Sequence, residues 1–338
     1  MERYSRQILF EGIGEAGQRR LLEARAVIIG CGALGTAQAE ALARAGVGRL
    51  RIVDRDFVEA SNLQRQTMFT EEDARERLPK AIACARHLAE INSEIEVEPV
   101  VADASHTNIE KFIEGCDVVV DGTDNFATRF LINDACVKHE VNWIYGAAVS
   151  SYGVTMTVRP HATPCLRCVL EETPPAASAP TCDTAGVIMP IISVVAAVQV
   201  SEALKLLTGN IESLHNSLMH FDVWNNEWRR MKLGTPAEDC KACALGRFES
   251  LETETGEFAA VLCGRNAVQI SPSQSVRVDF TKMAERLRGA GEVNFNDYLL
   301  RFRAGDYELT IFQDARAIIR GTDDVPTARS LYAKYIGN

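Results

Sequence analysis

Four cysteines of the sequence stand in two Cys-x-x-Cys pairs, Cys165 with Cys168 and Cys240 with Cys243. Together the pairs offer four thiolates, which is a ligand set of tetrahedral zinc. Because four protein ligands leave no open coordination position, we expect a structural zinc ion rather than a catalytic one. A redox-active dithiol is the competing interpretation of such pairs.

A second chemical signal is a glycine-rich turn with Gly30, Gly32, Ala33 and Gly35, which lies between an apolar stretch and a helix-forming one. In this arrangement the backbone N–H groups at the start of the helix bind a phosphate. The turn alone does not distinguish a dinucleotide from ATP. Asp54 ends the next predicted strand, where a carboxylate can hydrogen-bond a ribose, and capping of the strand end is its alternative role.

The polar stretch after Asp54 favours ATP. Arg65 lies in this stretch, and Lys80 follows Pro79 at a predicted helix start. A triphosphate carries more negative charge than the bridging phosphates of a dinucleotide, so it requires fixed cations and a metal ion. Arg65 and Lys80 can supply the cations, and a solvated surface position is the alternative for each. The nucleotide-binding residues expected here are Asp56, Ser61, Asn62, Gln64, Arg65 and Lys80.

Asp124 completes this set. The stretch "VVVDGTDNFATR" ends a predicted buried strand and enters a helix. We therefore expect Asp121, Asp124 and Asn125 at the carboxyl edge of the sheet, where such folds bind their ligands. A carboxylate there can hold Mg²⁺ against the phosphates. The alternative role of Asp124 is a helix cap.

The elements that must position these residues alternate between strand and helix. Apolar runs predict strands, and helical periodicity predicts helices between them. This rhythm indicates an α/β fold with a doubly wound, mostly parallel Rossmann-like sheet. Two later stretches indicate one more strand and a hairpin. The predicted strands span 26–29, 49–53, 95–101, 117–120, 143–146 and 152–160, the hairpin spans 220–233, and the helices lie near 37–45, 72–91 and 125–139.

The composition divides the chain into parts. Residues 1–245 are expected to form the nucleotide-binding domain, 246–258 a linker, and 259–338 a small α+β domain that binds a partner. Within the first part, residues 171–186 are rich in Pro, Ala, Ser and Thr, a composition that packs poorly and predicts a mobile crossing loop.

Charge and hydropathy exclude several function classes. A net charge of −10 argues against broad binding to nucleic acid or to an anionic membrane surface. The amino terminus has no apolar signal-peptide core, and the most apolar helical stretch, 187–200, is 14 residues long, too short to span a bilayer. With ten cysteines and no export signal, we expect reduced thiols and a cytoplasmic location.

Several unrelated motifs then recur in one order: "RYSRQI", "GCGALG", "SNLQRQ", the Pro79-Lys80 pair, "DGTDN", "TCDTAGV" and the two cysteine pairs. In these motifs the chain, from about Arg3 to Cys243, resembles the MoeB/ThiF/HesA family of ubiquitin-activating-like sulfur-carrier adenylyltransferases. The sequence departs from the family pattern at Ala33, where a further glycine is common.

This resemblance implies a reaction in which ATP adenylates the C-terminal Gly-Gly carboxylate of a ubiquitin-fold sulfur carrier and pyrophosphate is released. By the same resemblance, Asp54 binds the ribose, Asn62, Arg65 and Lys80 hold the phosphates, and Asp124 binds Mg²⁺. The carrier's carboxylate is already ionised at neutral pH, so the step needs alignment and charge neutralisation rather than a general base.

The resemblance also implies partners. Arg6 is expected to reach the phosphates of a neighbouring subunit, which implies a homodimer. Cys182 lies where some family members carry a cysteine that bonds covalently to the carrier, although adenylation itself does not require that bond. A sulfur donor protein is a further expected partner. Molybdopterin, thiamine and related sulfur-transfer pathways all use such enzymes, so the pathway stays open.

Two other function classes stay open beside this one. An NAD-dependent oxidoreductase would use the same glycine turn but leaves Arg65, Lys80 and Asp124 without a role. A catalytically silent scaffold that binds carriers would need none of these three residues. The response of NADH fluorescence tests the first alternative, and carrier-dependent pyrophosphate exchange tests the second.

Overall fold

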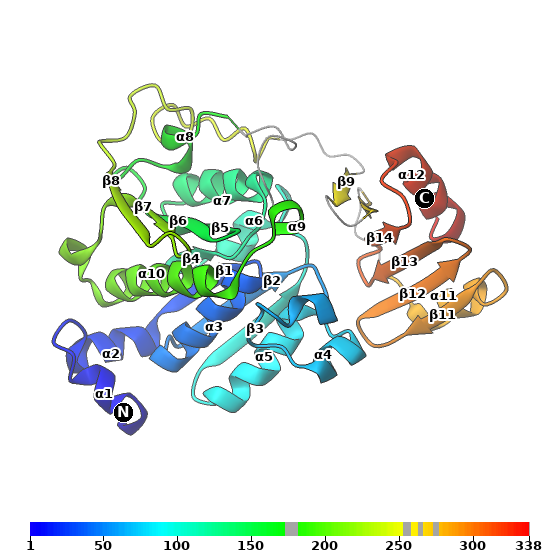
Figure 1. Cartoon of the computed structure of the whole chain (residues 1–338), viewed down its shortest axis with the longest axis horizontal. Helices are drawn as coiled ribbons and strands as arrows, with labels where there is room; N and C mark the ends of the chain where they lie inside the picture. The colour runs from blue at the N-terminus through cyan, green and yellow to red at the C-terminus, as the bar shows by residue number, and fades with distance from the viewer. Residues whose placement is uncertain (173–181, 253–257, 263–265, 273–276, 338) are drawn as a thin grey trace. The chain divides into compact units, whose positions relative to one another are not determined.

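The computed structural model describes residues 1–172, 182–252, 258–262, 266–272 and 277–337 (Figure 1). The chain divides into two compact units, Met1–Thr253 and Glu254–Asn338. Most of the predicted crossing loop and part of the predicted linker lie outside the described residues. Of that linker, Phe248 and Leu251 pack against the hydrophobic core of the first unit. The chain therefore stays folded onto this unit well past the second cysteine pair.

The first unit is built on an eight-stranded sheet in the order β3-β2-β1-β4-β5-β6-β7-β8. The strands from β3 to β5 pair in parallel, and those from β5 to β8 pair antiparallel. The predicted doubly wound, mostly parallel sheet is thus confirmed. The strands are β1 (Arg25–Ile29), β2 (Arg49–Asp54), β3 (Glu96–Val101), β4 (Val118–Asp121), β5 (Asn142–Val149), β6 (Tyr152–Val158), β7 (Ser217–Asp222) and β8 (Glu227–Lys232).

Helices cover both faces of this sheet (Figure 1). On one face, α3 packs over Ile28, and on the other, α7 joins the core cluster that contains Val27 and Ile29. Because side chains alternate along a strand, these two helices lie on opposite faces. The helices of the unit are α1 (Ser5–Ile8), α2 (Gly14–Glu23), α3 (Ala33–Ala45), α4 (Glu71–Glu76), α5 (Lys80–Ile91), α6 (Ile109–Ile113), α7 (Phe126–Lys138), α8 (Leu166–Val169), α9 (Cys182–Ala185) and α10 (Met189–Thr208).

The most apolar helix is longer than the sequence indicates. Among the described residues α10 is the one helix whose length and hydropathy would allow it to cross a membrane, and 61% of its most apolar stretch is buried inside the protein. Ile191 and Val195 pack against Leu34 of α3 and Phe221 of β7. The helix continues past Glu202 because this buried carboxylate is paired with Lys205, one helical turn further on.

The second unit is a smaller α+β domain, as predicted. Its six-stranded antiparallel sheet runs in the order β11-β12-β13-β14-β10-β9, and a core cluster that includes Phe302, Leu309 and Ile319 packs against two helices. The elements are β9 (Phe258–Leu262), β10 (Ala267–Ser271), α11 (Phe280–Leu287), β11 (Glu292–Phe295), β12 (Leu299–Ala304), β13 (Tyr307–Phe312), β14 (Ala317–Arg320) and α12 (Val325–Tyr335).

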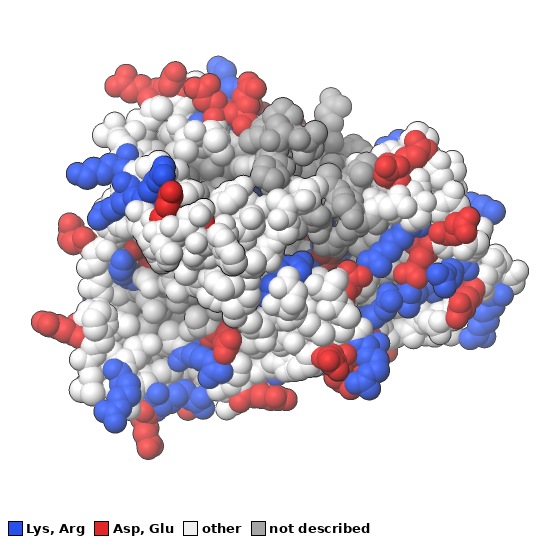
Figure 2. Space-filling view, viewed as in Figure 1, with Lys and Arg blue, Asp and Glu red and all other residues white. Residues whose placement is uncertain are grey.

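Charged side chains are distributed unevenly over the first unit. Every residue of β8, the edge strand with the sequence EWRRMK, is exposed. Figure 2 shows Lys and Arg side chains gathered where Figure 1 places this strand. Trp224 and Trp228 are also exposed here, at 77% and 59%. The edge of the sheet is therefore basic and aromatic although the chain as a whole is acidic.

Candidate active site

The three glycines of the turn between β1 and α3 serve two structural purposes. Gly30 has a φ of +90°, and a Cβ there would lie 2.7 Å from the backbone of Gly122. A Cβ on Gly35 would lie 1.9 Å from the carbonyl oxygen of Gly30. At Gly32 the nearest neighbour of an added Cβ is 3.9 Å away. Gly30 and Gly35 thus allow close packing, while Gly32 leaves its backbone accessible to a ligand.

The N-terminus of α3 offers backbone donors to an anion. The helix begins at Ala33 with Gly32 as N-cap, and no side chain caps it. The first N–H groups of a helix have no partner within the helix, and the helix dipole favours negative charge at this end. Ala33 contributes one of these N–H groups, so its methyl group does not remove the phosphate-binding feature of the turn.

Asp54 is held in place by this same turn. One of its carboxylate oxygens accepts a hydrogen bond of 2.6 Å from the backbone N–H of Cys31, and the other accepts one of 2.7 Å from the backbone N–H of Asp56. Burial raises the pKa of the Asp54 carboxyl, and the nearby positive charge of Lys80 opposes that shift. The acid at the end of β2 is therefore oriented by backbone donors, with lone pairs left for a ligand hydroxyl.

Lys80 is brought to the same edge of the sheet by α5. Its side chain is only 6% exposed, and Nζ lies 3.4 Å from a carboxylate oxygen of Asp56. The backbone N–H of Lys80 also donates to the carbonyl oxygen of Asp56 at 2.9 Å. A buried cation is costly unless charges compensate it, and here carboxylates of the β2 end do so. The surface interpretation of Lys80 is therefore wrong.

The "SNLQRQ" motif divides into structural and exposed positions. Asn62 is buried, and its side-chain oxygen accepts a hydrogen bond from the backbone N–H of Glu59 in a reciprocal capping box. Ser61 and Gln64 are exposed. Arg65 is partly buried, and its guanidinium donates to the carbonyl oxygen of Ser61 at 2.9 Å. In this state Arg65 is held by its own turn.

Gln66 was not predicted as a site residue. It is 4% exposed, and its side-chain oxygen has no hydrogen-bond partner among the described residues. Its amide nitrogen is the nearest atom to the position that a Cβ on Gly32 would occupy. A buried amide beside the phosphate-binding turn is a position where a ligand can supply the missing partner. The motif offered one signal for it, since Gln66 is one helical turn beyond Asn62.

The polar residues at the end of β4 and just after it have three different roles. Asn125 is the N-cap of α7 and accepts a hydrogen bond of 2.9 Å from the backbone N–H of Thr128. Asp124 is exposed, accepts a hydrogen bond from the side chain of Asn125, and does not cap the helix. Asp121 is fully buried against Arg129, with 3.5 Å between the ionic atoms. The expectation that Asp121 faces a ligand is therefore wrong, and Asp124 remains the accessible acid.

An ion pair that the sequence does not indicate links the loops that follow β2 and β3. The guanidinium of Arg55 has one nitrogen 3.2 Å from both carboxylate oxygens of Asp103, which follows β3. Another nitrogen lies 3.9 Å from Asp56. The sequence pattern indicates this ion pair only weakly, because both residues lie in loops just past strand ends, where charged residues are common. The pair lies beside the predicted ribose carboxylate.

The four paired cysteines form one cluster. Their sulfur atoms lie within 4.8 Å of one another, and the hydrogen-bonded sulfur pairs are 3.3 to 3.8 Å apart. Tetrahedral zinc with bonds of about 2.3 Å requires sulfur separations of about 3.8 Å. The hydrogen bond between Cys165 and Cys168 raises the pKa of the former and lowers the pKa of the latter to about 4. The donor set and its spacing therefore suit a zinc ion.

A buried ion pair braces this cluster. Arg167, between two of the cysteines, makes two hydrogen bonds of 2.8 Å to Asp134 of α7. The neighbouring Asn133 accepts a hydrogen bond from the backbone N–H of Leu166. Ser250 closes the arrangement, since its backbone N–H donates to Asp134 and its hydroxyl accepts from Arg167. The cysteine cluster is thus tied to the helix that follows Asp124.

Comparison with known proteins decides the family of the chain. A family model described as the ThiF family matches residues 4–242. The chain belongs to the ThiF family. It is 49% identical over 337 residues to the sulfur carrier protein ThiS adenylyltransferase of Bacillus subtilis, with 99% of both chains covered. It is 38% identical to the SAMP-activating enzyme E1 of Haloferax volcanii, with 75% of this chain and 92% of that protein covered.

Solved structures agree on the fold of this ThiF-family chain. The crystal structure of Escherichia coli MccB with ATP superposes with a TM-score of 0.61 at 24% identity, over 72% of this chain and 74% of that chain. This likeness concerns the fold alone. The resemblance identified from the sequence motifs is confirmed by the family match and by the relatives.

Two predicted site residues of the ThiF-family chain stand apart from the cluster at the strand ends. Arg6 lies on α1 and is exposed, with no hydrogen bond or ion pair among the described residues. Cys182 begins α9, and its side chain lies outside the described part of the chain. Outside the four-cysteine cluster, the described cysteines Cys31, Cys84 and Cys136 are buried and Cys116 is partly buried. Neither the covalent role of Cys182 nor the contact of Arg6 is tested by this geometry.

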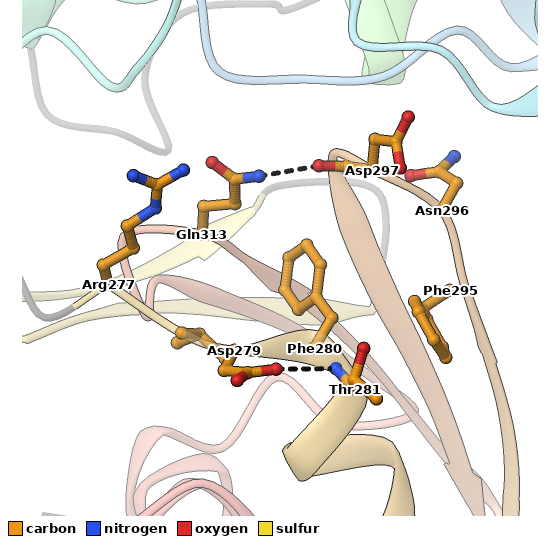
Figure 3. Close-up of a pocket in the computed structure, with 9 residues that line it drawn as sticks. Arg277, Asp279, Phe280, Thr281, Phe295, Asn296, Asp297 and Gln313 are labelled. Carbon is orange, nitrogen blue, oxygen red and sulfur yellow. Dashed lines mark hydrogen bonds between the residues drawn. The ribbon is translucent and has the colours of Figure 1, made fainter.

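The second unit has a hollow of its own, with a cavity volume of about 440 Å³. Figure 3 shows the Phe280 ring in the middle of this hollow, with Arg277 on one side and Phe295 on the other. Two of its polar side chains have structural roles, since Asp279 caps α11 and the Gln313 amide donates to the carbonyl oxygen of Asp297. None of the described residues that line this hollow is one that the sequence predicts for the site.

Proposed function

We propose that this chain is an adenylyltransferase that uses ATP to activate the C-terminal Gly-Gly carboxylate of a ubiquitin-fold sulfur carrier. A carboxylate oxygen attacks the α-phosphorus, the bond from that phosphorus to the bridging oxygen breaks, and pyrophosphate leaves with the electron pair. The products are the acyl-adenylate and pyrophosphate. The observation that carries the proposal is the buried Lys80 beside Asp54 and Asp56, next to the uncapped N-terminus of α3.

ATP fits these residues. The accessible backbone at Gly32 and the N–H groups at the start of α3 would take phosphate oxygens, and Asp54 would accept from a ribose hydroxyl. Lys80 would neutralise phosphate charge from its buried position. Arg65 would contribute after exchanging its carbonyl partner for a phosphate, with which a guanidinium makes stronger, charge-assisted hydrogen bonds. Asn62 holds the turn that carries Arg65.

Metal ions would serve two separate purposes. Asp124, exposed at the end of the β4 loop, would hold Mg²⁺, which supplies charge neutralisation to the phosphates. The four cysteines would hold a structural Zn²⁺ with no open position. No step of the reaction passes through the zinc ion. In both cases the donor atoms are those that each ion prefers in proteins.

The substrate class follows from a relative whose match covers nearly the whole chain. The Bacillus subtilis protein is named for the sulfur carrier protein ThiS, and its likeness to this chain extends through both units. We therefore favour a ThiS-type carrier as the substrate. We also propose a sulfur donor protein as a later partner and the cytoplasm as the location. The second unit would bind a partner of this reaction. A covalent bond between Cys182 and the carrier belongs to the sulfur-delivery stage of the same proposal.

Carrier-dependent exchange of labelled pyrophosphate into ATP tests this function. We expect exchange with a ThiS-type carrier, loss of exchange with Lys80→Ala, and no loss with Lys138→Ala, a matched change of an exposed lysine on α7. A carrier whose terminal Gly-Gly is removed is the substrate control. Carrier binding without exchange would favour the scaffold alternative, and a shift of NADH fluorescence would favour the oxidoreductase alternative.

A homodimer in which Arg6 acts on the partner's site can be tested by mixing subunits. We propose that Arg6→Ala and Lys80→Ala are each inactive alone. Mixed dimers then contain one site with both residues intact, so mixing restores part of the exchange activity. If mixing restores nothing while the dimers do exchange subunits, Arg6 acts within its own chain or not at all.

A further inference from the structure

The order of strands sets the direction in which a nucleotide lies. The sheet runs β3-β2-β1-β4, and all four strands are parallel, so their carboxyl ends meet at one edge. At β1 and β4 the backbones of Gly30 and Gly122 pack together beside the phosphate-binding turn. At β2, one strand further, stands Asp54, the predicted ribose acid. Neighbouring strands are about 4.8 Å apart, so a nucleotide with its phosphates at this turn and its ribose at Asp54 would extend its base towards β3.

Arg55 and Asp103 occupy the β2 and β3 positions of this edge. One guanidinium nitrogen of Arg55 is 3.2 Å from both oxygens of Asp103. Both side chains are partly buried, at 27% and 25% exposed. The loop that carries Asp103 is itself braced, since the Asn108 side chain donates to the Asp103 carbonyl oxygen at 2.8 Å and accepts from the backbone N–H of Ser105. The pair is thus a fixed feature of the site rather than a mobile surface contact.

The charges around Arg55 keep it a cation. Burial lowers the pKa of its guanidinium, but the carboxylates of Asp103 and Asp56 outweigh burial and raise that pKa above its ordinary value. Asp124 acts in the same direction from the β4 side. A planar cation held at a fixed angle can stack on an aromatic base and donate to its ring nitrogens.

We propose that Arg55, held by Asp103, contacts the adenine base and makes the site selective for ATP over GTP. This inference rests on the proposed function. Side by side, the two residues present donors and a carboxylate acceptor. Adenine matches them with a ring-nitrogen acceptor beside its exocyclic amino donor. Guanine has an oxygen in place of that amino group, so its base sets an acceptor against the Asp103 carboxylate.

Equilibrium binding of ATP, GTP and inorganic tripolyphosphate, measured by titration calorimetry, tests the pair. Arg55→Ala is expected to weaken ATP binding by roughly 5- to 100-fold, the range of a directional base contact. The same change leaves tripolyphosphate binding unaltered, because that ligand has no base. Arg55→Lys keeps the charge but lacks the planar fork, so it weakens ATP binding as well and serves if Arg55→Ala does not fold. Asp103→Asn, which replaces an acceptor by an amide that can donate to guanine, reduces the preference for ATP over GTP.

The chain offers a matched control on the same strands. Arg51 of β2 pairs with Glu98 of β3 at 2.8 Å, and the Arg51 side chain is 27% exposed, as is that of Arg55. Arg51 is away from the carboxyl edge, so Arg51→Ala removes a cross-strand ion pair without touching the base position. The change also removes two hydrogen bonds to the carbonyl oxygens of Lys111 and Phe112, so it perturbs the structure at least as much as the test variant. We expect it to leave the binding of all three ligands unchanged.

Three results overturn the inference. Equal weakening of ATP and tripolyphosphate by Arg55→Ala assigns the residue to the phosphates. Equal effects of Arg55→Ala and Arg51→Ala assign a general structural role. Unchanged affinities of the folded Arg55 variants for all three ligands mean that Arg55 has no role in binding them. If the wild-type protein prefers ATP over GTP but catalyses no pyrophosphate exchange with any carrier, the proposed function alone is refuted. If the wild-type protein catalyses this exchange but the Arg55 and Asp103 variants keep its preference for ATP over GTP, this inference alone is refuted.

Discussion

The guanidinium of Arg167 makes two hydrogen bonds of 2.8 Å to the carboxylate of Asp134, and neither side chain is more than 7% exposed. Arg167 lies on α8 between two cysteines of the cluster, and Asp134 lies within α7, whose N-cap residue directly follows Asp124. Two distant stretches of chain are therefore locked together by one buried ion pair. The ring of Phe130 packs under the same guanidinium, 4.9 Å from its centre.

Breaking this pair should destabilise the first unit. Arg167→Ala leaves the Asp134 carboxylate buried without its cation, which costs about 3 to 5 kcal/mol of unfolding free energy. Denaturant unfolding followed by circular dichroism measures the loss. The control is Arg229→Ala, which removes a cation 66% exposed from the pair with Glu227 and should change stability by less than about 1 kcal/mol. Equal losses in the two variants would contradict the structural role of the pair.

Zinc content and stability should change together. The wild-type protein is expected to copurify with one zinc ion per chain by elemental analysis, because its four sulfur atoms are already gathered. Cys240→Ser is expected to lose the metal and to lower the melting temperature, and a strong chelator should lower that of the wild type similarly. Cys136→Ser, a change at a buried cysteine outside the cluster, should leave the zinc content unchanged. Full zinc occupancy in Cys240→Ser would refute the four-thiolate site.

The glycines of the turn should respond differently to the same substitution. Gly35→Ala places a methyl group 1.9 Å from a carbonyl oxygen, so the backbone must move, at a cost of about 3 kcal/mol. At Gly32→Ala the nearest neighbouring atom is 3.9 Å from the added methyl group, so the change should cost only about 1 kcal/mol, that of a less favourable N-cap residue. Its methyl group nevertheless lies where we propose the phosphates, so it should weaken ATP binding. Thermal unfolding and ATP titration of both variants separate the two effects, and the reverse order of stabilities would contradict this assignment.

Asp73 should contribute to acid sensitivity. Its carboxylate accepts a hydrogen bond from the Thr70 backbone N–H and lies 2.8 Å from the His87 ring. Burial raises the pKa of Asp73, but these contacts outweigh burial, so the pKa is lowered. A lowered folded-state pKa means that the unfolded chain binds more protons, so stability rises with pH. The contribution is fully present above the unfolded pKa of about 3.9 and is lost as pH falls through the folded value.

Unfolding free energies measured between pH 6 and pH 3, a window set by that pKa of about 3.9, check this prediction. Asp73→Asn should lose stability at neutral pH and show a shallower decline on acidification than the wild type. Glu72→Gln, a change at the neighbouring carboxylate that is 56% exposed, should keep the wild-type slope. An unchanged slope in Asp73→Asn would assign the acid sensitivity to other groups.

The strands and motifs were predictable because local patterns determine them. A short apolar run such as 118–120 is typical of a strand buried on both faces. The glycines of the turn are required by close packing and by an accessible backbone, so their spacing is visible in the sequence. The length of α10 was underestimated because Glu202 and Lys205 look like the end of an apolar segment. In the fold they pair with each other, so the helix continues.

By itself, the sequence determined the parallel sheet, the cysteine cluster, the family and the residue types of the site, since each depends on spacing along the chain. The tertiary structure alone decided which charged residues meet. It buried Asp121 and Lys80, assigned the α7 cap to Asn125, and placed Arg55 against Asp103 and Gln66 beside Gly32. Those outcomes depend on strand order and on the depth of burial, because the free energy of a charge is determined by the groups that surround it in space.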